Sequence, residues 1–177
     1  MVFGASWAKD GSELYQLSVD LGKALGAAGF NVVSGGYLGT MEGVSKGVRE
    51  SGGEAIGVLV PTLFPDRATE GNRFLSSQLE TPTLLTRIDR MIACAEEPRG
   101  VLALPGTLGT LTEIFCAWNM AVLAPLGKYR PFKVICWRDP WEAILLPAAE
   151  RLSLAAEQRA ALVFVSSVEE ALAALGS

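Results

Sequence analysis

Short apolar runs alternate along the chain with longer segments in which apolar residues recur at helical spacing. The short runs predict strands, and the longer segments predict helices that pack on them. Glycine or proline closes most of these segments, as is typical of helix and strand ends. We expect strands over residues 1–3, 30–36, 54–61, 81–85, 100–106, 131–137 and 162–165. We expect helices over residues 12–29, 41–53, 87–97 and 110–124, and a helical last third, interrupted by the seventh strand, that ends with residues 167–175.

This regular alternation predicts an α/β fold with a mainly parallel sheet and helices on both faces. No linker with a shift in composition divides the chain, so we expect a single domain over residues 1–177. Residues 62–77 form the longest irregular stretch, and long loops in compact domains are often functional.

Composition restricts the function classes. Half of the 177 residues are hydrophobic, 19% are charged, and the formal net charge is −4. This acidic balance disfavours nucleic acid as a partner. No apolar run has the length of a membrane span, and the first residues lack the features of a signal peptide. We therefore expect a cytoplasmic protein with no membrane partner.

Histidine is absent, and the three cysteines, Cys94, Cys116 and Cys136, are widely spaced in apolar stretches. A zinc site of cysteine and histidine is thereby excluded, as is a triad that needs histidine. The cysteines are expected to be small buried core residues.

Two nearly identical segments, GYLGTM at residues 36–41 and GTLGTL at residues 106–111, each follow a predicted strand. Ligands of open α/β sheets bind beyond the carboxyl ends of the strands. Glycine allows a close backbone approach there, and the N-terminus of the following helix favours an anion such as phosphate. Thr40 and Thr110 can each bond a phosphate oxygen or cap a helix. A single glycine turn can also be no more than the turn that every strand–helix junction requires.

The glutamates behind the two turns differ in their offset. Glu42 follows Thr40 by two residues and Glu113 follows Thr110 by three, which places them about 100° apart around a helix. The two carboxylates are therefore expected to play different roles. Thr110 and Glu113 also match the spacing of a capping box, which would need no catalysis. The dinucleotide fingerprint GxGxxG is absent, which disfavours a nicotinamide enzyme.

LPGTLGTLTE at residues 104–113 resembles the PGGxGTxxE signature of LONELY GUY-type (LOG) proteins. TRIDRM at residues 86–91 resembles the Arg-Lys-x-x-Met segment that precedes this signature, with Arg87 on the arginine. The opening VFGAS and the upstream glycine turn also match, so the resemblance covers residues 2–137. It implies a Rossmann-like three-layer sandwich that forms a homodimer or homotetramer.

The resemblance further implies a phosphoribohydrolase, a hydrolase of N-glycosyl compounds. Such an enzyme cleaves AMP or a cytokinin riboside 5′-monophosphate to the free base and ribose 5-phosphate, without a metal or an organic cofactor. Carried over by position, Arg87 and Glu113 would be the catalytic pair. The substrate would be bound by Ser6, Gly35, Gly36, Gly39, Thr40, Arg90, Pro105, Gly106, Thr107, Gly109 and Thr110.

Three positions differ from the family pattern. Thr107 replaces the second glycine of the signature, Ile88 replaces the lysine, and Thr112 replaces a glutamate that plant-type relatives often carry. These differences resemble a divergent branch that includes molybdenum-cofactor carrier proteins. The alternative function is therefore a non-catalytic binding or carrier protein for a phosphorylated ligand such as the molybdenum cofactor.

The helix expected over residues 110–124 has little polar surface. We expect Trp118 and Met120 to lie at a subunit interface, with burial in the core as the alternative. Arg90 lies three residues after Arg87 and can share its helix face, toward the ligand or toward an acid across a subunit contact.

Overall fold

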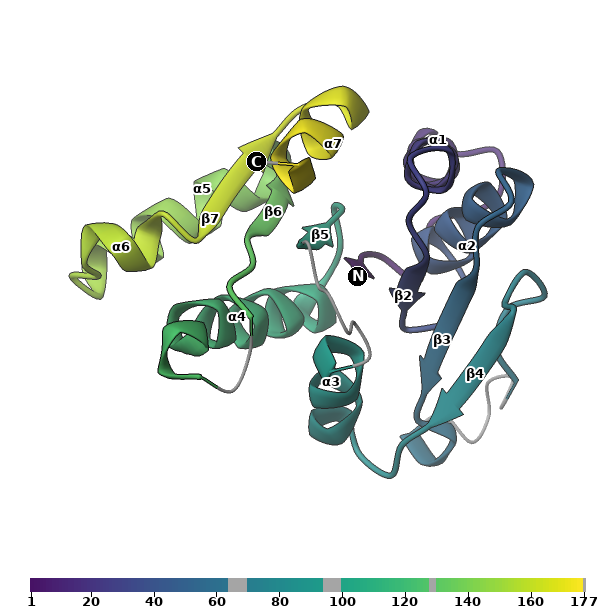
Figure 1. The fold of residues 1–177 in the computed structure, drawn as a ribbon, viewed down its shortest axis with the longest axis horizontal. Helices are drawn as coiled ribbons and strands as arrows, with labels where there is room; N and C mark the ends of the chain where they lie inside the picture. Colours follow the sequence, from purple (N-terminus) through teal and green to yellow (C-terminus); the bar gives the residue numbers. More distant parts are fainter. Residues whose placement is uncertain (64–69, 94–99, 128–129, 177) are drawn as a thin grey trace.

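The central sheet of the protein is parallel throughout (Figure 1). The structure, a computed structural model, describes residues 1–63, 70–93, 100–127 and 130–176. Within these ranges seven strands pair in the order β4-β3-β2-β1-β5-β6-β7. The strands are β1 (Val2–Phe3), β2 (Val32–Ser34), β3 (Ala55–Leu59), β4 (Ser77–Glu80), β5 (Val101–Ala103), β6 (Val134–Trp137) and β7 (Leu162–Val165).

Helices pack on both faces of the sheet. One face is covered by α1 (Glu13–Ala27), α2 (Thr40–Glu50) and α7 (Val168–Gly176), and the other by α3 (Leu84–Ala93), α4 (Leu108–Leu123) and α5 (Arg138–Arg151). Two 3₁₀ turns, Pro61–Leu63 and Ala124–Leu126, and the short helix α6 (Ala156–Arg159) complete the described elements. The predicted α/β fold, a Rossmann-like sandwich with a parallel sheet between two helical layers, is confirmed.

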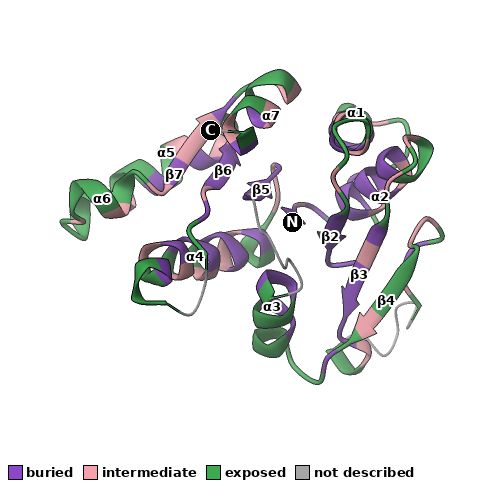
Figure 2. Ribbon diagram, viewed as in Figure 1, coloured by how far each residue is buried: buried purple, intermediate pink, exposed green. Residues whose placement is uncertain are grey.

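The strands supply alternate side chains to two hydrophobic cores, as parallel strands with both faces covered must. Val2 of β1 faces α1 and α2, and its neighbour Phe3 faces α3 and α4. Leu102 and Ala103 of β5 divide in the same way. Figure 2 shows the inner strands buried, whereas β4 at the edge of the sheet is largely exposed.

The chain changes direction across the sheet between β1 and β5. From β1 it builds outward through β2 and β3 to β4, and it then returns to β5 on the other side of β1. Such a switch point opens a crevice at the carboxyl ends of the two strands. The segment Gly4–Ser6 follows β1 and the segment Leu104–Gly106 follows β5, so both lie at this crevice.

The strand predicted over residues 81–85 is wrong. The edge strand is β4, four residues earlier, and α3 already begins at Leu84. Thr83 and Thr86 explain the difference, because each hydroxyl accepts a hydrogen bond from the backbone N–H of the other, at 3.2 and 3.1 Å. This exchange stabilises a helix start, which the β-prone threonines concealed.

The cysteine prediction holds for Cys136, which is buried, whereas Cys116 is only half-buried. Cys94 and the last part of the helix expected over residues 87–97 lie outside the described residues. No helix of the described ranges has both the length and the apolar character to cross a membrane.

Candidate active site

Arg87 and Glu113 meet beside the switch point, although they lie on different helices. Arg87 belongs to α3 and Glu113 to α4, and Nη1 of the arginine lies 3.4 Å from Oε1 of the glutamate. The two residues are only 7% and 8% exposed. A charged pair this deeply buried costs desolvation energy and is poor evidence of a stability role. Its position beside the crevice makes it the best candidate for chemistry.

The guanidinium of Arg87 is held from several sides. Its Nε donates a hydrogen bond to the carbonyl of Val58 at 2.8 Å. β2 pairs with β3 only as far as Gly57, whereas β3 continues beside β4 as far as Leu59. The Val58 carbonyl therefore lies beyond the end of β2. Nη2 lies 4.0 Å from Sδ of Met41, and the guanidinium carbon lies 5.7 Å from the centre of the Tyr37 ring.

Burial raises the pKa of Glu113 to about 7, and the positive charge of Arg87 limits that rise. The carboxyl therefore exchanges its proton near neutral pH, as a general base or acid must. Its neighbour one turn along α4 is Cys116, whose pKa is also raised, by burial and then by the charge of Glu113.

Glu113 does not cap its helix. The capping-box interpretation needed Thr110 as the N-cap residue, but α4 begins at Leu108 with Thr107 in that position. The carboxylate of Glu113 contacts Arg87 instead. The capping interpretation is therefore wrong, because the N-cap lies three residues earlier than the pattern suggested.

The second glycine turn is open to solvent. Thr107, Leu108 and Gly109 are exposed, and Thr107 makes no side-chain cap bond. A Cβ on Gly109 would meet nothing within 4 Å, whereas one on Gly106 would overlap the buried side chain of Thr110. Pro105 and Gly106 are half-buried. The free N–H groups at the start of this 16-residue helix can accept an anion.

The first glycine turn is closed. Gly39 adopts a φ of 72°, and a Cβ there would overlap the carbonyl oxygen of Ala5. That carbonyl accepts hydrogen bonds from both the backbone N–H of Thr40 at 2.9 Å and its hydroxyl at 3.2 Å. Gly36, at a φ of 74°, lies against the backbone of Gly57. The N-terminus of α2 is therefore occupied by the chain itself.

Two residues of this region were missed by the sequence analysis. Asn72 is buried, and its side-chain amide donates to the carbonyls of Gly36 at 3.1 Å and Tyr37 at 3.0 Å. Tyr37 accepts a hydrogen bond from the N–H of Val60 at 2.8 Å. A tyrosine inside a glycine turn was a signal available in the sequence, whereas Asn72 lies in an irregular stretch that offered none.

The remaining predicted site residues lie around this centre. Gly35 lies directly beneath the Arg87 guanidinium, and Ser6 is exposed next to Gly39. Arg90 is exposed, in contrast to the buried Arg87 one turn before it.

Trp118 is buried in the core, and its Nε1 donates to the carbonyl of Gln158 at 2.7 Å. Burial of Trp118 in the core is the alternative that the sequence left open, and it is what the structure shows, while Met120 is half-buried. That this helix lies at a subunit interface stays a prediction. A second tryptophan, Trp141 of α5, donates from Nε1 to the carbonyl of Leu104 at 3.0 Å and fixes the end of β5.

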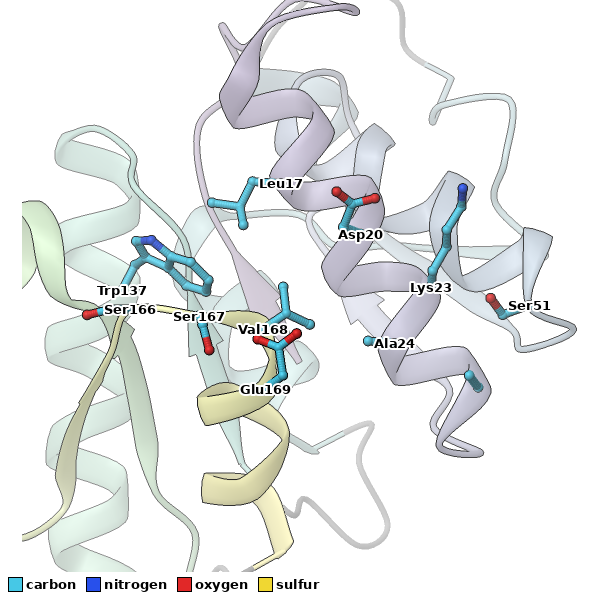
Figure 3. A pocket seen from close by; sticks show the side chains of 11 residues that line it. Leu17, Asp20, Lys23, Ala24, Ser51, Trp137, Ser166, Ser167, Val168 and Glu169 are labelled. Atoms are coloured by element: carbon cyan, nitrogen blue, oxygen red, sulfur yellow. The ribbon is translucent and has the colours of Figure 1, made fainter.

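Another groove lies elsewhere, between α1 and α7 (Figure 3). It has a volume of about 710 Å³, and Leu17, Asp20, Trp137 and Glu169 are among its lining residues. Two polar residues that line it already have partners within the chain. Lys23 forms an ion pair with Glu50 at 3.1 Å, and the hydroxyl of Ser167 accepts the N–H of Glu170 at the start of α7. Neither Arg87 nor Glu113 lines it, so its size alone does not make it the active site.

Comparison with known proteins supports the family resemblance. The SLOG cluster4 family model matches residues 1–128. A cytokinin riboside 5′-monophosphate phosphoribohydrolase from Mycobacterium tuberculosis is 28% identical over 131 residues, 73% of this chain and 65% of that protein. A probable enzyme of the same name from Oryza sativa is 29% identical over 84% of this chain and 63% of its own length. The chain thus spans slightly less than two thirds of these relatives.

The fold is shared with proteins of known structure. A molybdenum cofactor binding protein from Rippkaea orientalis has a TM-score of 0.70 at 20% identity, covering 97% of this chain and 91% of that one. The molybdenum cofactor carrier protein of Chlamydomonas reinhardtii has a TM-score of 0.68 at 20% identity, covering 99% and 93%. The resemblance to LOG proteins is confirmed, and these structures confirm the architecture.

Proposed function

The chain belongs to the SLOG cluster4 family, and from that premise we propose that it is a nucleoside 5′-monophosphate phosphoribohydrolase. The reaction adds water across the N-glycosidic bond of AMP or of a cytokinin riboside monophosphate. The hydroxyl goes to C1′ of the ribose and the proton to the departing base. The names of its relatives support this reaction class.

The observation that carries the proposal is the buried ion pair between Arg87 and Glu113 at the switch point of the sheet. Breaking the ribosyl C–N bond builds positive charge on the sugar, which a carboxylate stabilises most strongly in a site shielded from water. Ionised Glu113 can serve this role or orient the attacking water. Arg87 can assist the departing base or bind the phosphate, since its charge is permanent and its donors are planar.

The phosphate is proposed to bind at the second glycine turn. Gly106, Gly109 and Thr110 surround the N-terminus of α4, whose free N–H groups and dipole favour an anion. Among the described residues, no group of three or more Cys, Asp or Glu side chains is placed to hold a metal ion. The charges proposed to act in the reaction are those of Arg87 and Glu113.

The test is incubation with AMP and with N6-substituted AMPs, followed by chromatography for free base and ribose 5-phosphate. We expect base release whose kcat/KM rises with pH up to about 7, because Glu113 must lose its proton to act as a carboxylate. An absence of base release across the panel, at saturating substrate, would contradict the proposal.

A second candidate function is a non-catalytic carrier of a phosphorylated ligand such as the molybdenum cofactor. Thr107 favours it, because a side chain stands exposed at the N-cap of α4 where the LOG signature has glycine. Such a carrier would bind its ligand tightly without turnover. Pterin fluorescence that co-purifies with the protein, together with no release of base, would support this candidate over the hydrolase.

We also propose that the protein assembles as a homodimer or homotetramer through the outer face of α4. Phe115 and Leu123 are exposed there, at 37% and 44%, and the described part of this helix carries no charged residue except the buried Glu113. Sedimentation should show a species larger than 18.8 kDa. A monomer at micromolar concentration would contradict the assembly and leave the catalytic proposal intact.

A further inference from the structure

We propose that Gly35 and Tyr37 of the first glycine turn are positioning residues, which set the place of the Arg87 guanidinium opposite Glu113. The catalytic consequence rests on the proposed function. The positioning itself does not, and it can be measured without substrate.

Gly35 makes room for the arginine. A Cβ at this position would overlap Nη2 of Arg87 and would lie 2.8 Å from its Cζ and 2.7 Å from Sδ of Met41. The φ of Gly35 is outside the left-handed region, unlike that of Gly36. The backbone of Gly35 therefore does not require glycine, and the absence of a side chain matters because the guanidinium lies in the space that a side chain would fill.

Tyr37 bounds the same guanidinium on another side. Its ring centre lies 5.7 Å from Cζ of Arg87, within the range of a cation–π contact. The residue is held at its side chain and at its backbone, since its hydroxyl accepts the N–H of Val60 at 2.8 Å and its backbone carbonyl accepts a bond from Asn72 at 3.0 Å. A ring fixed in this way limits where the guanidinium can lie.

Val58 and Glu113 make further contacts with the Arg87 guanidinium group. The carbonyl of Val58 accepts from Nε at 2.8 Å, and Glu113 lies 3.4 Å from Nη1. The titratable and charged groups that face the Glu113 carboxyl among the described residues are Arg87 from α3 and Cys116 on α4 itself. A displaced guanidinium would therefore be reported by the proton equilibrium of Glu113.

The experiment compares Gly35→Ala, Tyr37→Leu and Tyr37→Phe with wild type. Gly176→Ala is the matched control, because a Cβ at Gly176 meets nothing within 4 Å. The first readout is an NMR titration of the Glu113 carboxyl carbon in the substrate-free protein, with the signal assigned by its loss in Glu113→Gln. Removing a nearby positive charge raises a carboxyl pKa by about one unit or more.

We expect that rise in Gly35→Ala and Tyr37→Leu, a smaller rise in Tyr37→Phe, which keeps the ring but loses its hydrogen bond to Val60, and a wild-type titration in Gly176→Ala. Thermal unfolding monitored by circular dichroism checks that Gly35→Ala remains folded, as expected because the overlapping atoms belong to movable side-chain ends. A wild-type titration in folded Gly35→Ala would overturn the role of Gly35. Equal titrations of Tyr37→Leu and Tyr37→Phe would overturn the role of the ring.

The second readout is the rate of base release from AMP. Misplacing a catalytic group by about 1 Å costs roughly 100-fold in rate. We expect a loss of that size in kcat for Gly35→Ala, with KM changed less than threefold. If wild type releases no base, the proposed function fails, while the titrations still decide whether Gly35 and Tyr37 position the arginine.

Discussion

The two glycine turns share four of six residues but differ in what surrounds them. The turn at residues 36–41 is closed, because Ala5 occupies the N-terminus of α2 and Gly57 lies against Gly36. The turn at residues 106–111 is open, with Thr107 and Gly109 exposed at the N-terminus of α4. The same local sequence thus makes a structural support in one place and a candidate ligand site in the other.

The difference follows from what each turn meets beyond the carboxyl ends of the strands. β1 is followed by Gly4 and Ala5, which fold over the start of α2, and a Cβ on Gly4 would overlap the hydroxyl of Thr40. The corresponding space beside Gly109 has no neighbour within 4 Å. The lesson is that a glycine motif specifies a close backbone approach, while the partner in that approach, chain or ligand, is decided by tertiary structure.

The largest expected effect separates the two glutamates. Glu113→Gln should reduce kcat for base release by roughly 1,000-fold, because it removes the ionisable group of the site. Glu42→Gln is the matched control, since Glu42 pairs at 3.7 Å with the exposed Arg73 on the outside of the closed turn. The kcat of Glu42→Gln for base release should remain within twofold of wild type. Equal losses in the two variants would end the distinction between an open catalytic turn and a closed structural one.

A substitution in the closed turn should lower the free energy of unfolding more than one in the open turn. Gly39→Ala places a side chain at a φ of 72° and against Ala5, and backbone strain of this kind costs about 3 kcal/mol. Urea unfolding should show this loss in the midpoint without a change in the m-value. A variant with wild-type stability would show that the first turn is not closed in solution.

Glu113 should make the stability depend on pH. Its pKa is raised from 4.5 to about 7 in the folded protein, so its stabilising contribution is full below pH 4.5 and is lost as the pH rises to about 7. The stability of wild type relative to Glu113→Gln should therefore fall on the order of 3 kcal/mol over that range, at about 1.4 kcal/mol per unit. Urea unfolding of both proteins between pH 4 and 8 measures it. Parallel curves would mean that the carboxyl is not buried.

The smallest effect concerns the open turn. Gly109→Ala should leave stability unchanged or raise it by up to about 1 kcal/mol, because alanine favours the helix and its Cβ meets nothing within 4 Å. Binding of ribose 5-phosphate, measured by calorimetry, should weaken several-fold, since the methyl group enters the space proposed for the phosphate. Unchanged affinity would place the phosphate elsewhere. Gly176→Ala again serves as the control.

The sequence predicted the architecture well, because it depends on repeated patterns. Alternating runs of apolar residues identified the order of strands and helices, and the resemblance brought Arg87 and Glu113 forward together although 26 residues separate them. Their ion pair in the structure could not be derived from either segment alone. It depends on how α3 and α4 pack on the sheet.

The failures came where a local pattern has two physical meanings. Thr81–Leu85 has the β-branched composition of a strand, but the hydroxyls of Thr83 and Thr86 start a helix. The edge strand β4 was hidden by its polar, exposed residues, since an edge strand buries little. The burial of Trp118 depends on long-range contacts, such as the hydrogen bond from its Nε1 to the carbonyl of Gln158, 40 residues away, which no local pattern predicts.

The hydrogen bond from Trp141 to the carbonyl of Leu104 has a consequence for chimeras built from this protein and its relatives. The family match ends at residue 128, so Trp141 lies beyond it, yet it fastens the last residue before Pro105 and the open turn. A chimera joined at residue 128 would contain the whole signature but would lack Trp141, which fixes the end of β5 just before it. The part of this chain that supports the open turn therefore extends beyond the segment by which its family is recognised.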